Sequence, residues 1–185
     1  MRIIGGKLRG LHLADVGAGD PDAHLRPTTD RVRETMFNLL INSLGIRLDG
    51  IRVLDLFAGT GALGLEALSR GATRVSFVDD GATARALLRE NVEKAHAMGA
   101  TDIWRRDATR LGPNRGAGYD LIFMDPPYGK ALGEVALKSA LDGGWLADDA
   151  VVVWEDSTPP TLPAGFKLLD QRRYGDTLVT ILQKG

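Results

Sequence analysis

An Asp-Pro-Pro-Tyr motif at residues 125–128 carries the side chains best suited to chemistry. It follows the apolar run 121–124, and its prolines fix a rigid exit from a strand while their carbonyl groups remain able to accept hydrogen bonds. The exocyclic amine of a nucleobase is a poor nucleophile because its lone pair is delocalised into the ring. Hydrogen bonds to the Asp125 carboxylate and the Pro126 carbonyl would orient such an amine and favour a tetrahedral nitrogen. Tyr128 could stack on a base that has left its helix.

A glycine-rich turn at residues 57–64 is the second feature, and it also follows an apolar strand. Gly59 and Gly61 would let the backbone approach a ligand at the carboxyl end of that strand. The spacing G-x-G-x-x-G also fits a nicotinamide dinucleotide site, and a tight turn without a ligand is the simplest alternative. Asp55 argues against the dinucleotide, because an acid there would lie near the pyrophosphate. The same acid suits a ligand with an amino group and a sulfonium, such as S-adenosylmethionine.

Acidic residues follow the next two expected strands. Asp79 lies about twenty residues beyond the glycines, where a carboxylate can accept hydrogen bonds from both hydroxyls of a ribose. Asp80 should point elsewhere, and both acids could instead be solvated helix caps. Asp107 could bind an adenine amine, with ion pairs to Arg106 and Arg110 as the alternative. These positions extend the expected cofactor site from the glycine turn to the third strand.

Alternating strands and helices must position these residues. Apolar patterns predict strands at 51–57, 74–78, 102–105, 119–124, 150–154, 166–173 and 177–183, and helices at 62–70, 82–98 and 132–141. Strand–helix alternation predicts a mainly parallel α/β sheet that is covered on both faces. The last two strands form a hairpin, which adds an antiparallel strand at one edge. Residues 49–185 are therefore expected to form one Rossmann-like domain.

Residues 1–48 are expected to form an N-terminal extension of that domain. Two short strands around the Gly5-Gly6 turn would make a β-hairpin within residues 2–13, and residues 14–25 are expected to be a mobile loop. A helix follows at about residues 28–44, with an apolar stripe and good capping residues at its start. We expect this extension to face RNA.

The charges of the chain favour local rather than global attraction to a polyanion. The formal net charge is −1, so a basic field over the whole molecule is absent. Lys7 and Arg9 stand in a stretch without acids, and Arg31 and Arg33 lie in the expected N-terminal helix. These four side chains are candidates for phosphate contacts, with Lys7 and Arg9 the weaker pair. A solvated helix face is the alternative for Arg31 and Arg33.

The composition excludes several classes of protein. The chain of 185 residues has no cysteine, and its three histidines are too scattered to predict a metal site. No apolar run approaches the length that spans a bilayer, and the first residues do not resemble a signal peptide. A cytoplasmic protein without a membrane partner is expected. The sequence favours a monomer without fixing the oligomeric state.

Four segments together resemble the bacterial 16S (small-subunit) ribosomal RNA guanine-N2 methyltransferases: residues 2–10, 26–38, 55–68 and 125–128, with a looser match at 143–146. The resemblance covers essentially the whole chain. It implies the Rossmann-like fold of class I S-adenosylmethionine-dependent methyltransferases and methylation of one guanine in this RNA, naked or in an assembling 30S particle. It implies cofactor contacts at Asp55, Phe57, Gly59, Thr60, Gly61, Asp79, Asp107 and Ala108, and base contacts at Asp125, Pro126 and Tyr128.

The chain departs from the family pattern at two positions, and two rival functions stay open. Family members often carry Glu at position 79 and another acid two residues later, whereas this chain has Asp79 and Gly81. Asp-Pro-Pro-Tyr also occurs in adenine-N6 methyltransferases of DNA, but this chain shows no obvious target-recognition domain. A non-catalytic RNA-binding assembly factor is the second rival. The intact Asp125 and glycine turn argue against it.

Overall fold

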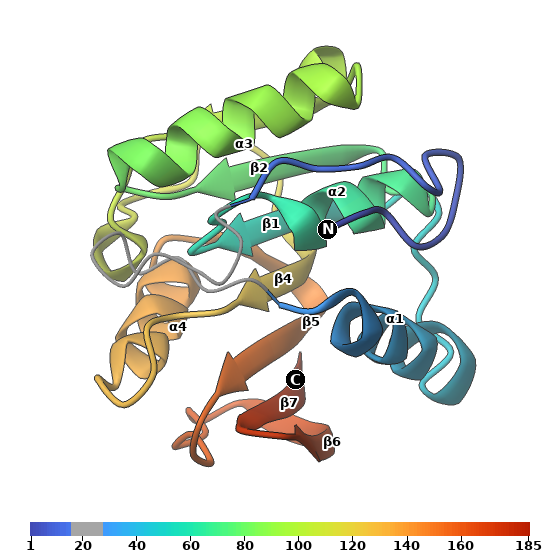
Figure 1. The fold of residues 1–185 in the computed structure, drawn as a ribbon. Coiled ribbons are helices and arrows are strands. Elements are labelled where there is room, and N and C mark those ends of the chain that lie inside the picture. Colours follow the sequence, from blue (N-terminus) through green and yellow to red (C-terminus); the bar gives the residue numbers. More distant parts are fainter. Residues whose placement is uncertain (16–27) are drawn as a thin grey trace.

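A single seven-stranded sheet forms the centre of the molecule, in the strand order β3-β2-β1-β4-β5-β7-β6 (Figure 1). The computed structural model describes residues 1–15 and 28–185. The strands are β1 (Arg52–Leu56), β2 (Arg74–Val78), β3 (Thr101–Trp104), β4 (Tyr119–Met124), β5 (Leu146–Asp156), β6 (Phe166–Tyr174) and β7 (Thr177–Lys184). Strands β1 to β5 pair in parallel, and β7 runs antiparallel to both of its neighbours. The expected α/β sheet with an antiparallel C-terminal strand is confirmed.

Helices cover both faces of this sheet. They are α1 (Asp30–Asn38), α2 (Ala62–Ser69), α3 (Ala82–Lys94) and α4 (Leu132–Asp142), with a π-helical turn (Leu39–Ser43) after α1 and short 3-10 turns at Met98–Ala100 and Ala108–Arg110. Alternate residues of β4 point to opposite faces, as in any strand. Phe123 packs with α1, α2 and α3, whereas Ile122 packs with α4. Among the described residues, no helix is long and apolar enough to cross a membrane.

Helix α2 packs directly against strand β2 at Gly64. A Cβ atom at Gly64 would lie 2.5 Å from Cε1 of Phe77 and 2.8 Å from Cγ1 of Val75, both in β2. Real side chains do not approach so closely, so this position requires glycine. The third glycine of the G-x-G-x-x-G pattern therefore serves helix–sheet packing.

The N-terminal extension differs from the predicted hairpin. Within residues 1–15, the two halves are joined by an isolated antiparallel bridge between Arg2 and His12 and by a hydrogen bond from the Gly10 N–H to the Ile3 carbonyl, and residues 5–10 form bends and turns. Backbone N–H groups of Ile4, Gly5 and Leu8 bind side chains of α2 instead of forming a ladder. The prediction of two strands was therefore wrong, because α2 offers these groups partners that the sequence pattern does not reveal.

The predicted bounds of other elements need smaller corrections. The helix expected at 28–44 is an α-helix only to Asn38 and then widens into the π-helical turn. Helix α3 ends at Lys94 rather than at residue 98, because the backbone of His96 is left-handed and cannot continue the helix. Strand β5 begins four residues earlier than expected. Beyond residue 15, the loop expected at 14–25 lies outside the described residues.

Candidate active site

The carboxyl ends of three neighbouring strands bring the predicted site residues together. Leu56, the last residue of β1, lies opposite Val78 of β2 and Met124 of β4. All three strands run in parallel, so the residues that follow them meet at one edge of the sheet. The glycine turn, Asp79 and Asp125 therefore lie beside one another. Ligands bind at this edge in open α/β sheets.

The glycine turn has a backbone that most residues cannot adopt. Gly59 has φ 57° and Gly61 has φ 81°, and a Cβ atom at Gly61 would overlap Leu88 of α3. The N–H of Gly61 donates to the Ala58 carbonyl at 2.9 Å, which closes the turn. Phe57 also has a positive φ of 56°, a conformation that is strained for a bulky residue and often found at functional sites.

Asp79 holds the glycine turn from the end of β2. Its carboxylate accepts hydrogen bonds from the N–H of Gly59 at 2.9 Å and the N–H of Gly81 at 2.8 Å. Burial raises the pKa of Asp79, and the charge of Asp80 acts in the same direction, while the two N–H groups oppose them. Each carboxylate oxygen can accept a further hydrogen bond, so the group is able to receive ribose hydroxyls as well. Asp80 is exposed, as expected.

Asp55 places a buried carboxylate beneath the turn. Only 2% of the residue is exposed, and its Oδ2 accepts a hydrogen bond from the Gly64 N–H at 3.0 Å. Burial raises the pKa of Asp55 well above its usual value, and the charges of Asp125 and Asp79 raise it further. Three carboxyl groups thus share this edge. A ligand with a positively charged sulfonium and an amino group would relieve their repulsion, so S-adenosylmethionine fits the site.

Asp107 lies at the far end of the expected cofactor site, after β3. Its carboxylate accepts hydrogen bonds from the hydroxyl (2.6 Å) and the N–H (2.9 Å) of Thr109. The hydroxyl bond is the main cause that lowers the pKa of Asp107. Of the two alternative ion pairs, only that with the exposed Arg110 forms, at 3.5 Å. Arg106 instead stacks over Trp104 with its guanidinium carbon 4.6 Å from the ring centre. Both Asp107 and the buried Ala108 thus remain proposals as cofactor contacts.

The Asp-Pro-Pro-Tyr segment leaves β4 between the glycine turn and the C-terminal hairpin. Asp125 and Tyr128 are half-buried, and Pro126 is buried. The Tyr128 hydroxyl lies 2.9 Å from Oγ1 of Thr177, the first residue of β7. The hairpin therefore fixes the tip of the aromatic side chain.

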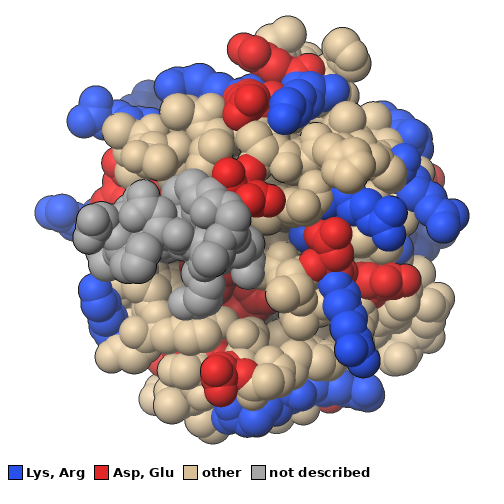
Figure 2. Space-filling model, viewed as in Figure 1, with Lys and Arg blue, Asp and Glu red and all other residues tan. Residues whose placement is uncertain are grey.

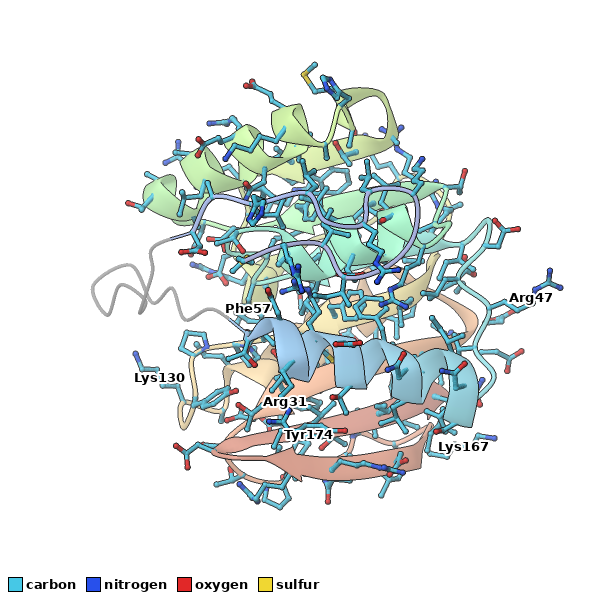
Figure 3. All side chains as sticks on the ribbon, turned by 45° about the vertical axis from the view of Figure 1, so that its right-hand side comes forward. Arg31, Arg47, Phe57, Lys130, Lys167 and Tyr174 are labelled. Atoms are coloured by element: carbon cyan, nitrogen blue, oxygen red, sulfur yellow. The ribbon has the colours of Figure 1, made fainter. Side chains whose placement is uncertain are left out.

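The basic side chains proposed for RNA are not equivalent. Lys7, Arg9 and Arg31 are exposed, and Figure 3 shows Arg31 pointing from α1 toward the part of the sheet that carries Tyr174. Figure 2 shows basic side chains scattered over the face in view rather than gathered in one patch. The exposed candidates could thus supply local contacts only.

Arg33 is a correction. Its side chain is fully buried, and its Nε lies 3.2 Å from Oε1 of the fully buried Glu66 in α2. Its Nη2 also pairs with Asp30 at 2.9 Å and donates to the Arg2 carbonyl. The guanidinium therefore joins α1, α2 and the N-terminal segment, and it cannot contact a phosphate. Both earlier interpretations, a phosphate contact and a solvated helix face, are wrong for this residue.

Four polar residues that hold the site or the N-terminal segment in place escaped the sequence analysis: Glu66, Ser69, Asn91 and Thr177. The first three are at most 3% exposed. Asn91 falls on the same helical stripe as the buried Ala84 and Leu88, and this is the signal that could have marked it. A polar residue on an apolar stripe needs buried partners. In the part of the chain that the structure describes, no group of three acidic or histidine residues could hold a metal ion.

Comparisons with known proteins agree with this arrangement. A family model described as "Conserved hypothetical protein 95" matches residues 1–183. Ribosomal RNA small subunit methyltransferase D of Escherichia coli K12 is 37% identical over 189 residues, which cover 100% of this chain and 90% of the relative. The protein of the same name from Haemophilus influenzae is 33% identical over 180 residues, covering 95% of this chain and 89% of that protein.

A solved structure extends the likeness to three dimensions. The Escherichia coli protein yhhF is 35% identical and superposes with a TM-score of 0.84, over 100% of this chain and 97% of that one. The predicted methyltransferase fold is thereby confirmed, and S-adenosylmethionine is the cofactor that the site must accommodate. The match over almost every residue shows that the chain belongs to the family described as Conserved hypothetical protein 95.

Proposed function

We propose that this protein transfers a methyl group from S-adenosylmethionine to the exocyclic N2 of a guanine in small-subunit ribosomal RNA. One observation carries the proposal: the register of Leu56 opposite Met124 sets the glycine turn of β1 directly beside the Asp-Pro-Pro-Tyr segment of β4. A cofactor site and a site that accepts hydrogen bonds from an amine thus share one edge. The names of the relatives support ribosomal RNA as substrate.

On the cofactor side, the chain supplies carboxylates and a glycine backbone that has no side chains in the way of a ligand. Asp79 accepts the ribose hydroxyls while it holds Gly59, and Asp55 gives a buried carboxyl group whose ionised form a bound cation would stabilise. Asp107 and Ala108 meet the adenine, and Phe57 and Thr60 complete the turn around Gly59 and Gly61. When bound, S-adenosylmethionine would supply an electrophilic methyl group, with the neutral thioether of S-adenosylhomocysteine as the leaving group.

On the substrate side, hydrogen-bond acceptors act on the amine. Asp125 and the Pro126 carbonyl accept its N–H groups, which holds the nitrogen lone pair out of the plane of the ring and toward the methyl group. Positioning of this kind accounts for much of the rate of a group transfer. Tyr128 stacks on the base, and its bond to Thr177 keeps the ring in place. Residues 1–48 form the RNA-facing extension, with Lys7, Arg9 and Arg31 as phosphate contacts.

The test is transfer of a labelled methyl group followed by nucleoside analysis. Naked small-subunit RNA and partly assembled 30S particles are incubated with the protein and labelled S-adenosylmethionine. We expect label on N2 of guanine. Label on adenine N6 would identify an adenine enzyme instead, and cofactor binding without transfer to either substrate would favour a non-catalytic assembly factor.

A further inference from the structure

The N-terminal segment is fastened along α2, the helix that begins at the glycine turn (Figure 1). The N–H of Leu8 donates to Oγ of Ser69 at 2.9 Å, and this hydroxyl donates to the Gly5 carbonyl at 2.6 Å. The N–H of Lys7 also donates to the Ser69 carbonyl at 2.9 Å. The backbone that presents the proposed phosphate contacts is therefore held by a helix of the cofactor site.

Asn91 joins the end of the same segment to the glycine turn itself. Its side chain is fully buried in α3, and its Oδ1 accepts a hydrogen bond from the Ala14 N–H at 2.7 Å. Its Nδ2 donates to the Ala14 carbonyl at 2.9 Å and to the Thr60 carbonyl at 2.9 Å. Because one partner is a donor and two are acceptors, only this orientation of the amide satisfies all three. A single side chain thus holds both segments.

The hydrogen bond from Asn91 to the Thr60 carbonyl holds the backbone of the glycine turn, where we propose that the cofactor binds. The Thr60 carbonyl belongs to the peptide whose N–H, that of Gly61, closes the glycine turn against Ala58. Both carbonyl groups bind the same nitrogen of Asn91, so a shift of Ala14 turns the amide away from Thr60. Leaving either carbonyl without its buried donor is unfavourable. The position of the N-terminal segment and the conformation of the turn are therefore linked.

We propose that Asn91 is a positioning residue that couples RNA binding by residues 1–15 to cofactor binding at the glycine turn, an inference that rests on the proposed function. Each ligand favours the arrangement in which Asn91 holds Ala14 and Thr60 together, and so each increases the affinity for the other. Linkage requires the two increases to be equal. Asn91 acts through the backbone of Ala14 and Thr60 and not on the reacting atoms.

The coupling is measured by calorimetry with S-adenosylhomocysteine, which binds without turnover, in the presence and absence of protein-free small-subunit RNA. We expect the RNA to tighten binding by about fivefold or more in the unmodified protein. Asn91→Asp keeps the acceptor for the Ala14 N–H but sets an oxygen against both carbonyls. In this variant, the affinity for S-adenosylhomocysteine with RNA divided by the affinity without RNA should be close to one. A folded Asn91→Asp protein that keeps the original ratio would overturn the inference.

Ser69→Ala is the matched control, because it loosens the same segment without touching the glycine turn. We expect this variant to bind RNA more weakly, while RNA still tightens the binding of S-adenosylhomocysteine by the original factor. If RNA no longer tightened that binding, a specific role of Asn91 would be contradicted. If the unmodified protein binds both ligands with a ratio of one, the coupling is absent while the proposed function stands. If it binds neither ligand, the proposed function itself fails.

A measurement on the unmodified protein avoids any folding defect of the variants. Hydrogen exchange at the Ala14 amide reports on the bond to Asn91. We expect S-adenosylhomocysteine alone to slow this exchange, although the amide lies in the N-terminal segment. The amide of Leu8, which binds Ser69 instead, should change less. Unchanged exchange at Ala14 in the presence of bound ligand would contradict the coupling.

Discussion

The hydroxyl of Tyr128 lies 2.9 Å from Oγ1 of Thr177, so the aromatic residue of the Asp-Pro-Pro-Tyr motif is fixed by the first residue of β7. This bond and the stacking of the ring are separable. Tyr128→Phe and Thr177→Val each remove the bond and should lower methyl transfer only slightly. Tyr128→Ala should weaken RNA binding in addition, because stacking of a base on an aromatic ring contributes about 1–3 kcal/mol. Equal loss in the Phe and Ala variants would refute the stacking role.

Asp125→Ala should abolish or greatly reduce methyl transfer while the fold and most of the cofactor affinity remain. In the proposed mechanism the carboxylate aligns the amine toward the methyl group and this interaction strengthens as the new bond forms, so its loss would act mainly on the transition state. Transfer of labelled methyl is measured alongside calorimetric binding of the cofactor. Full activity of a folded variant would disprove the mechanism, whichever base carries the label.

Asp79→Ala should weaken S-adenosylmethionine binding by roughly 1.5–3 kcal/mol, the range for hydrogen bonds to a charged group. Two effects contribute, since the change would remove the proposed ribose contacts and also releases the N–H groups of Gly59 and Gly81. Asp80→Ala, one residue further on and exposed, serves as the control and should bind normally. Calorimetry showing unchanged affinity in the Asp79 variant would place the ribose elsewhere.

Asp55→Asn should change how stability depends on pH in the cofactor-free protein. Burial raises the pKa of Asp55 in the folded state, so its carboxyl favours folding below the ordinary pKa of an aspartate. That contribution is lost as the pH rises through the raised pKa. The amide side chain in the variant does not titrate. The Tm of the variant should therefore rise relative to the Tm of the original protein as the pH increases. Parallel Tm curves would contradict this expectation, and cofactor affinity should fall in the variant.

Arg31→Gln and Arg33→Gln should affect different properties, although the residues stand only two positions apart. The first should change RNA binding, and the second should change the stability of the fold. Arg31 is exposed, so its loss should reduce the salt slope of RNA binding by about 1 and leave Tm unchanged. Arg33→Gln breaks a buried ion pair with Glu66 and should destabilise the fold by about 3–5 kcal/mol. Thermal unfolding and salt titrations distinguish the two. A normal Tm for the Arg33 variant would contradict its structural role.

The candidate site was the most predictable part of the structure, because local sequence determines it. An apolar run, two glycines and an acid identify a strand, its turn and the carboxylate at its edge, and β2 and β4 were predicted to the residue. Pairing of these strands then follows from the parallel topology. Asp55, Asp79 and Asp125 meet for that reason.

The N-terminal extension was the least predictable part, because distant partners determine it. Glu66 of α2 binds Ile4, Gly5 and Arg33, residues 33 to 62 positions away in the chain. The sequence pattern of residues 1–48 does not indicate that they bind a residue of α2. An exposed arginine and a buried one also look alike in sequence, which is why Arg31 and Arg33 were grouped together.

The order of the last two strands affects how the chain can fold during synthesis. β7 lies between β5 and β6, although β6 leaves the ribosome before it. Until residues 177–184 emerge, the edge of β5 stays open, β6 has no strand to pair with, and Tyr128 lacks its Thr177 contact. Open strand edges attract other chains. The eight residues of β7 therefore both cover the edge of β5 and supply the Thr177 contact of Tyr128, so neither feature can form before β7 has been synthesised.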